Sequence, residues 1–243
     1  MQSPFQPNIT HPPVLAPYQQ ALVSRFIAKT YGWMFLGLLL TGLVSFQMAS
    51  SETAMKMLFE NRWMFYGVMI AEFALVMGMT AMFQKLSTPA AMVGFLVYAA
   101  LNGVTLSMIF LIYTMSSVAH VFFISAGMFG GLALFGSVTG KSLAGVGSFV
   151  GMGLWGLILV GLANLFIQSD ALSMGLAVGG VFIFAGLTAY DAQKIKTMAL
   201  QTVTADQSGD HAAKGSIFGA LMLYLNFINL FLSLLRLFGE RRR

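Results

Sequence analysis

The sequence predicts an all-α membrane protein, a bundle of about seven transmembrane helices. Of its 243 residues, 58% are hydrophobic and only 9% are charged, about a third of the charged share of an ordinary soluble domain. The apolar residues also fall in blocks about 20 residues long, which is the length that a helix needs to cross the hydrocarbon core of a bilayer. Lipid is therefore the expected solvent for most of this chain.

Each expected span is an apolar block bounded by polar or glycine-containing stretches. In order, the spans are 31–49, 63–83, 89–113, 119–138, 146–166, 172–190 and 217–235. Glycine inside these blocks is compatible with a helix, because the bilayer penalises every unmade backbone hydrogen bond. Very short connections between the second and third, third and fourth, and fifth and sixth spans leave no room for a further domain. A single transmembrane domain over residues 29–243 is predicted.

The stretch before this domain, residues 1–28, contains no long apolar run and is rich in proline. Five of the six prolines lie there: Pro4, Pro7, Pro12, Pro13 and Pro17. The first apolar block starts too far into the chain for a signal peptide. We therefore expect a flexible N-terminal tail over residues 1–28.

Basic residues in the loops predict the orientation, because cytoplasmic loops carry an excess of Lys and Arg. One side of the predicted bundle would carry Arg25, Lys29, Lys85, Lys141, Lys194, Lys196 and Lys214, and the other Lys56 and Arg62. This difference predicts a cytoplasmic N-terminus. A complete seventh crossing would place Arg236 and Arg241–Arg243 on the opposite side, against the same rule, but late charges have less influence than early ones. We expect the last segment to cross rather than to re-enter.

Glycines four residues apart share one face of a helix, and such faces let two helix backbones approach closely. The pairs are Gly127 with Gly131, Gly136 with Gly140, Gly147 with Gly151, Gly175 with Gly179, and Gly215 with Gly219. Close packing within one bundle is the simpler interpretation. A dimer interface is the alternative.

Several functional classes find no support in the composition. The formal charge of +5 is scattered over loops and ends, which does not suit a nucleic-acid partner, and cysteine is absent. The three histidines, His11, His120 and His211, lack metal-ligand spacing. No convincing arrangement for intramembrane proteolysis or phosphate-loop chemistry is present. We therefore expect a protein that is not an enzyme and has no resident cofactor.

Two carboxylates are candidates for function, because a charged group inside the bilayer costs about 2.5 kcal/mol or more. Glu72 lies near the middle of the second expected span, and Asp191 closes the sixth. An interfacial residue that merely ends an apolar run is the alternative for Asp191. In the last span, Asn226, Asn229 and Ser233 form a polar stripe that should face the bundle interior. Hydrogen bonding between helices is the structural alternative for that stripe.

Two late segments resemble the bacterial branch of the transmembrane Bax-inhibitor-motif family. They are Gly186-Leu-Thr-Ala-Tyr-Asp-Ala-Gln-Lys-Ile-Lys196 and Leu223-Tyr-Leu-Asn-Phe-Ile-Asn-Leu-Phe-Leu-Ser-Leu-Leu-Arg236, and the likeness extends back to Tyr31-Gly-Trp-Met34. The resemblance implies seven helices with the last one central and the other six around it. It also implies a pH-sensitive leak pathway for calcium, in which carboxylates of the sixth and seventh helices meet and share a proton.

In this sequence Asp191 matches the first carboxylate, but the position matching the second is Asn226, an amide. Two close carboxylates resist double ionisation and so act as a proton switch, whereas an amide does not titrate. Asn226 can still donate a hydrogen bond to Asp191. We therefore expect any pH response of this protein to be shifted or blunted in comparison with a family member that has two carboxylates. Calcium prefers six to eight oxygen ligands, so Asp191, with Glu72 and Asn229 as further ion-pathway candidates, would form only a weak, transient calcium site.

The first functional hypothesis is therefore a calcium leak channel of the membrane, influenced by pH through Asp191 and Asn226. A non-conducting regulator that binds a protein partner, such as a membrane protease, and a cation/proton exchanger are the alternatives. The expected partners are the lipid bilayer, calcium and protons. Because the resemblance is to bacterial proteins, a bacterial inner membrane is the expected location.

Overall fold

The computed structural model describes residues 16–83, 85–204 and 209–242, and almost all of them are helical. The helices are α1 (Pro17–Ser50), α2 (Glu52–Glu60), α3 (Arg62–Ala81), α4 (Thr88–Leu106), α5 (Ile109–Ile112), α6 (Met115–Val138), α7 (Ala144–Ile167), α8 (Asp170–Thr204) and α9 (Asp210–Phe238). Seven spans are long and apolar enough to cross a membrane: α1, α3, α4 with α5, α6, α7, α8 and α9. The predicted seven-helix membrane fold is confirmed.

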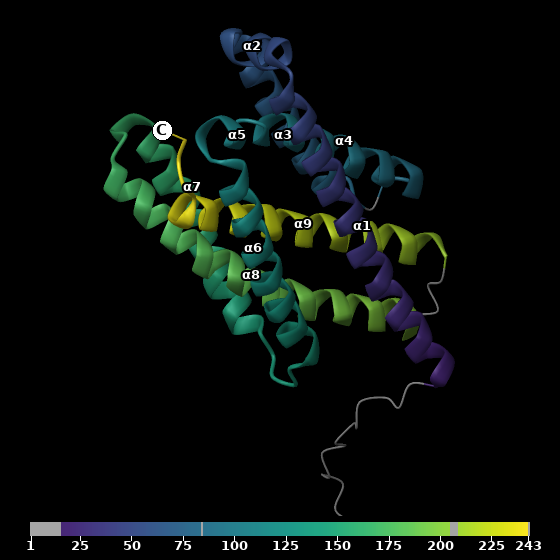
Figure 1. Cartoon of the computed structure of the whole chain (residues 1–243). Helices are drawn as coiled ribbons and strands as arrows, with labels where there is room; N and C mark the ends of the chain where they lie inside the picture. Colours follow the sequence, from purple (N-terminus) through teal and green to yellow (C-terminus); the bar gives the residue numbers. More distant parts are fainter. Residues whose placement is uncertain (1–15, 84, 205–208, 243) are drawn as a thin grey trace, which may run out of the picture.

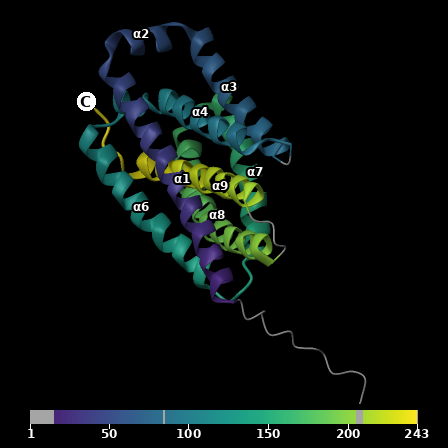
Figure 2. The same cartoon turned by 90° about the vertical axis from the view of Figure 1, so that its right-hand side faces the viewer.

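The last helix is the centre of the bundle. In α9, 67% of the most apolar stretch is buried, compared with 6% to 28% in the other six spans. It packs against α1, α4, α6 and α8, and both views show it crossing the middle of the molecule with these helices around it (Figures 1 and 2). The expectation of a central last helix is therefore confirmed.

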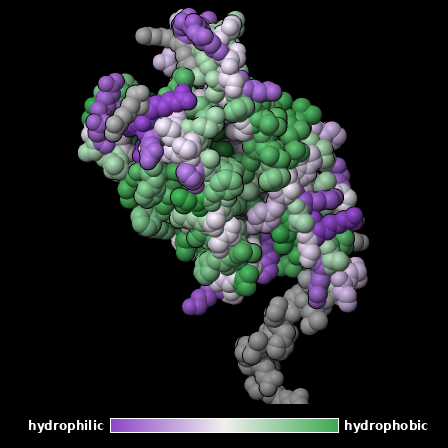
Figure 3. Space-filling model, in the orientation of Figure 1, coloured by the Kyte–Doolittle hydropathy of each residue, from purple (hydrophilic) through white to green (hydrophobic). Residues whose placement is uncertain are grey.

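The outer surface is apolar in a way that water would not tolerate. Phe123, Phe149 and Trp155 are 72%, 70% and 69% exposed. Hydrophobic residues cover the middle of the face seen in Figure 3, and hydrophilic residues gather toward its edges. A surface of this kind fits a hydrocarbon solvent between two polar interfaces, so the chain is an integral membrane protein.

The N-terminal boundary differs from the predicted one. Residues 1–15 of the expected tail lie outside the described residues, but α1 begins at Pro17 and not near position 29. Proline is well suited to the first turn of a helix, since its missing N–H would have no partner there. Val23 and Phe26 are buried in the core. This packing extends the helix through residues 17–28, which the prediction assigned to a tail.

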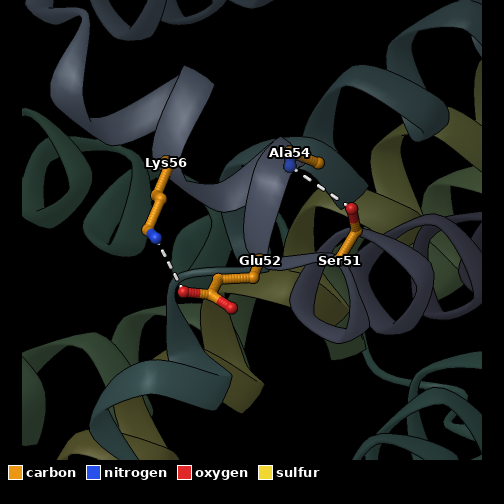
Figure 4. Close-up of polar contacts among 4 residues, drawn as sticks. All are labelled: Ser51, Glu52, Ala54 and Lys56. Atoms are coloured by element: carbon orange, nitrogen blue, oxygen red, sulfur yellow. Dashed lines mark hydrogen bonds and ion pairs between the residues drawn. The ribbon is translucent and has the colours of Figure 1, made fainter.

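A short helix, α2, which the apolar spans did not predict, joins α1 to α3. The Ser51 hydroxyl caps it by accepting from the Ala54 amide at 3.3 Å, and Lys56 pairs with Glu52 at 2.7 Å (Figure 4). The ion pair is exposed and stabilises the helix little. Burial of Met55 and Leu58 holds α2 against the bundle instead.

The third predicted span is interrupted near its end. Ser107 is fully buried between α4 and α5, and its hydroxyl donates to the Val104 carbonyl at 2.6 Å. The chain turns there, and α5 continues for one turn to Ile112 before Tyr113 adopts extended backbone. The span predicted as one helix over 89–113 is therefore two helices.

The C-terminal segment lies at the opposite end of the bundle from the start of α9. At the start, Lys214 Nζ donates to the Leu86 carbonyl at 2.9 Å, which places it beside the α3–α4 connection. Beyond the other end, the Glu240 amide donates to the Ser117 hydroxyl at 2.9 Å, at the beginning of α6. The last helix thus runs the full length of the bundle, as expected, and Arg241 and Arg242 follow it at the end that also carries α2.

Half of the paired glycines serve close packing inside the bundle. A Cβ at Gly219 would lie 3.0 Å from Thr30, and one at Gly215 would lie 3.2 Å from Phe26, so this pair lets α1 approach α9. Gly136, Gly147 and Gly179 likewise face α8 or α7, whereas their partners and both Gly127 and Gly131 face open space. Close packing within one bundle, the simpler interpretation, therefore accounts for five of these ten glycines.

Replacing Gly136 tests this packing, because a Cβ there would overlap the backbone of Ala189 on α8. We expect Gly136→Ala to lower the thermal unfolding midpoint in detergent by about 3 to 10 °C, since overpacking costs about 1–3 kcal/mol. Gly131→Ala on the same helix is the control, because its Cβ would meet open space. Equal midpoints for the two variants would contradict the packing described for α6 and α8.

Candidate functional site

The centre of the candidate site is a direct contact between α8 and α9. Asn226 Nδ2 donates a hydrogen bond of 2.7 Å to Asp191 Oδ2, and both side chains are buried, at 5% and 7% exposure. Asp191 does not end the helix, because α8 continues to Thr204. The carboxylate is therefore packed between α8 and α9, at the point where the apolar run of α8 ends. The two residues predicted to pair do so.

Asp191 has no ion-pair partner in the part of the chain that the structure describes. The hydrogen bond from the Asn226 amide and the coulombic attraction of Lys194, three residues on along α8, are what the site offers against burial. A carboxylate within membrane-spanning helices is expensive to bury and marks a functional site by default. A neutral donor and a lysine beyond ion-pair distance compensate for this cost only in part.

Asp191 and Asn226 line a cavity of about 710 Å³ between α3, α7, α8 and α9, which we call the α9 cavity. The polar stripe of α9 continues along it through Asn229, Ser233 and Arg236. These positions recur every three or four residues and so share one helix face. A polar track therefore runs from the buried pair to the last turn of α9.

The outer part of this track is satisfied by its own helix. Asn229 Nδ2 donates to the Leu225 carbonyl at 2.8 Å, and the Ser233 hydroxyl donates to the Asn229 carbonyl at 2.7 Å. The Ser233 hydroxyl and one N–H of Asn229 are therefore bonded without a partner from another helix. The structural alternative of interhelical hydrogen bonding holds for Asn226 but not for Asn229 or Ser233.

Glu72 lies apart from this cavity. The Thr105 hydroxyl of α4 donates to its carboxylate, and the neighbouring residues Phe73 and Val76 line the cavity instead. The structure therefore does not bring Glu72 together with Asp191. Hydropathy placed Glu72 correctly within a span, but it could not indicate which face of α3 meets α4.

Tyr224 fixes the rotation of α9 two residues before Asn226. The Thr41 hydroxyl of α1 donates to the Ala99 carbonyl at 2.8 Å, so its oxygen accepts the Tyr224 hydroxyl at 2.7 Å. The rings of Phe95 and Tyr98 stand edge-on to Tyr224 with centroids 5.8 Å away. These contacts tie α9 to α1 and α4 and leave the opposite face, with Asn226, toward α8.

Gln193 of α8 makes a contact near the site that the sequence analysis missed. Its Oε1 accepts from the Leu143 amide at 2.8 Å, and its Nε2 donates to the Lys141 carbonyl at 2.9 Å. One side chain two positions after Asp191 therefore holds the connection between α6 and α7. Its position in the segment 186–196, which carries the family resemblance, was the signal in the sequence that could have indicated it.

This site has few side chains that could bind a metal ion. Among the described residues, no three His, Asp or Glu side chains gather as a metal site. Calcium prefers six to eight oxygen ligands, and Asp191 is the one carboxylate that lines the α9 cavity. The cavity therefore offers one charged ligand to a cation.

Known proteins resemble this chain over nearly its whole length. It is 47% identical over 223 residues to the inner membrane protein YbhL of Escherichia coli, covering 92% of this chain and 94% of that protein. An uncharacterized protein of Borreliella burgdorferi is 40% identical, with 92% and 96% covered. An uncharacterized membrane protein of Streptococcus pyogenes is 38% identical, with 90% and 93% covered.

The match to a family model agrees with these relatives. Residues 23–243 match the model described as inhibitor of apoptosis-promoting Bax1. The matched region includes both late segments on which the resemblance rested, with Asp191 in one and Asn226 in the other. The chain therefore belongs to the Bax-inhibitor family of membrane proteins.

Proposed function

We propose that this protein lets calcium move passively across its membrane and that the protonation of Asp191 controls this flow. The observation that carries the proposal is the buried Asp191–Asn226 hydrogen bond of 2.7 Å at the wall of the α9 cavity, which the polar stripe of α9 follows. An ionised carboxylate there attracts a divalent cation, and protonation removes that attraction. The flow should therefore decrease as the pH falls.

The proposal places the N-terminus in the cytoplasm and the protein in a bacterial inner membrane. Support for the orientation comes from the seven basic residues predicted on the same side as the N-terminus, in comparison with two, Lys56 and Arg62, on the other side. Support for the location comes from YbhL, which is named as an inner membrane protein. Under this proposal calcium is the transported ion and not a resident cofactor, and the protein catalyses no reaction.

The roles of the candidate residues differ under this proposal. Asp191 senses the proton and offers a weak, transient calcium site, and Asn226 orients its carboxylate. Asn229 belongs to the pathway because it lines the same cavity one turn along α9. Glu72 is a separate ion-pathway candidate, whose carboxylate is engaged by Thr105.

Neutralising Asp191 is the first test. Purified protein in liposomes, read with an enclosed calcium indicator, should show calcium entry down a gradient that is faster at mildly alkaline than at mildly acidic pH. In Asp191→Asn, we expect the ratio of these two rates to fall to about one, because the titrating group is gone. Asp170→Asn, at the exposed first turn of the same helix, should keep the ratio of the unmodified protein.

Three outcomes would overturn this proposal. A pH dependence retained in Asp191→Asn would remove Asp191 as the sensor. Obligatory proton counter-flow would indicate an exchanger. Absence of flux together with specific capture of a partner protein would indicate a regulator.

Replacing Asn226 by Asp restores a pair of carboxylates and is the second test. Two close carboxylates resist double ionisation, so their two protons leave in separate steps. We therefore expect the pH profile of calcium flux to shift toward higher pH, because one carboxyl of the pair keeps its proton longer. The control is Asn164→Asp, which adds a carboxylate on α7 where the side-chain oxygen already accepts from the Ser169 amide at 2.9 Å. An unchanged pH profile in Asn226→Asp, or an equal shift in the control, would contradict coupling at the pair.

A further inference from the structure

The α9 cavity opens sideways, between α3 and α7. Phe73 of α3 and Ile158 of α7 both line it, and both are exposed, at 68% and 44%. In the described residues α3 packs on α2 and α4, while α7 packs on α8. The two helices therefore form facing walls of a cleft whose mouth lies on the surface that the membrane covers.

The walls of this cleft are apolar, and most donors of its polar outer floor are bonded. Phe73, Val76, Leu154 and Leu157 contribute hydrocarbon surface, and the Ser233 hydroxyl and one N–H of Asn229 are bonded to their own helix backbone. A lipid chain lying on such a floor would leave these bonds in place, so its desolvation cost is limited to the remaining N–H and the Oδ1 of Asn229. The volume of about 710 Å³ lies in the range that accepts a ligand of drug size.

The outer end of the cleft carries a positive charge. Arg236 lies in the last turn of α9, lines the cavity and is exposed, and no acidic side chain among the described residues pairs with it. The helix ends two residues later, at Phe238. A guanidinium at the end of a membrane helix lies at headgroup level, where lipid phosphates are the available anions, and its planar donors match a phosphate.

We propose that the cleft binds one anionic phospholipid, with an acyl chain between α3 and α7 and its phosphate on Arg236. Apolar walls and one unpaired guanidinium at the membrane interface match the two ends of such a molecule. An acyl chain in the cleft excludes the water that an ion would need to reach Asp191. This regulatory consequence rests on the proposed calcium flow, but the binding site itself does not.

Lipid retention measured by native mass spectrometry tests the site without measuring calcium flow. Phosphatidylglycerol and phosphatidylcholine with identical chains are added separately to the purified protein in detergent. The unmodified protein should retain phosphatidylglycerol preferentially. In Arg236→Gln this preference should fall about five-fold, the effect of about one interfacial charge. Arg242→Gln, an exposed arginine outside the cleft, is the matched control and should keep the preference.

A second variant tests the hydrocarbon part of the cleft. Gly161 lines the cavity, and a Cβ there would meet open space, so Gly161→Leu should place a side chain in the cleft and reduce retention of both lipids. Gly156→Leu is its control, because Gly156 lies on the same helix outside the cavity and a Cβ there also meets open space. Full retention of phosphatidylglycerol in either Arg236→Gln or Gly161→Leu would overturn the site. So would complete competition by inorganic phosphate, which would indicate an anion site without a chain.

Discussion

The hydrogen bond between Asn226 and Asp191 depends on how α9 is held in the centre of the bundle. In a bilayer, burying apolar surface between helices gives little driving force, because lipid is equally apolar, so close packing and polar contacts must fix the arrangement. Gly215 and Gly219 let α1 approach α9, and the hydroxyl contact of 2.7 Å between Tyr224 and Thr41 fixes its rotation. Because the face of α9 that carries Tyr224 packs on α1, Asn226 points toward α8, where Asp191 lies.

An amide at position 226 changes what this contact can do. A pair of carboxylates would repel each other when both are ionised and would therefore couple conformation to the number of bound protons. The Asn226 amide instead donates to Asp191 in a bond of fixed direction, so the contact holds with either one proton or none at the carboxyl. The local difference between the two states is one charge rather than a broken contact. The site is therefore better suited to graded attraction of a cation than to a steep conformational switch.

The sequence predicted the spans and the polar stripe of α9 because each depends on a local or periodic signal, whereas the pairing of Asp191 with Asn226 was predicted from the resemblance to a known family. Blocks of apolar residues reveal where lipid must lie, and spacing of three or four reveals that Asn226 and Asn229 share a face. Other features depend on three-dimensional neighbours. The helical start at Pro17 follows from packing of Phe26, the partner of Glu72 follows from the rotation of α3, and α2 is too short for a span signal. Hydropathy measures transfer into lipid and carries no information on which face meets which helix.

The polar residues of α9 obtain their hydrogen bonds in two ways. This difference explains why the bundle can be open between α3 and α7. The hydrogen bond that Asp191 accepts comes from Asn226 on another helix, so this part needs α8 and α9 to remain in contact. The Ser233 hydroxyl and one N–H of Asn229 bond to their own helix backbone. The bundle can therefore leave α3 and α7 apart beside the outer part without breaking these bonds. If all three positions had required interhelical partners, the cleft beside α9 would carry an energetic penalty that lipid could not relieve.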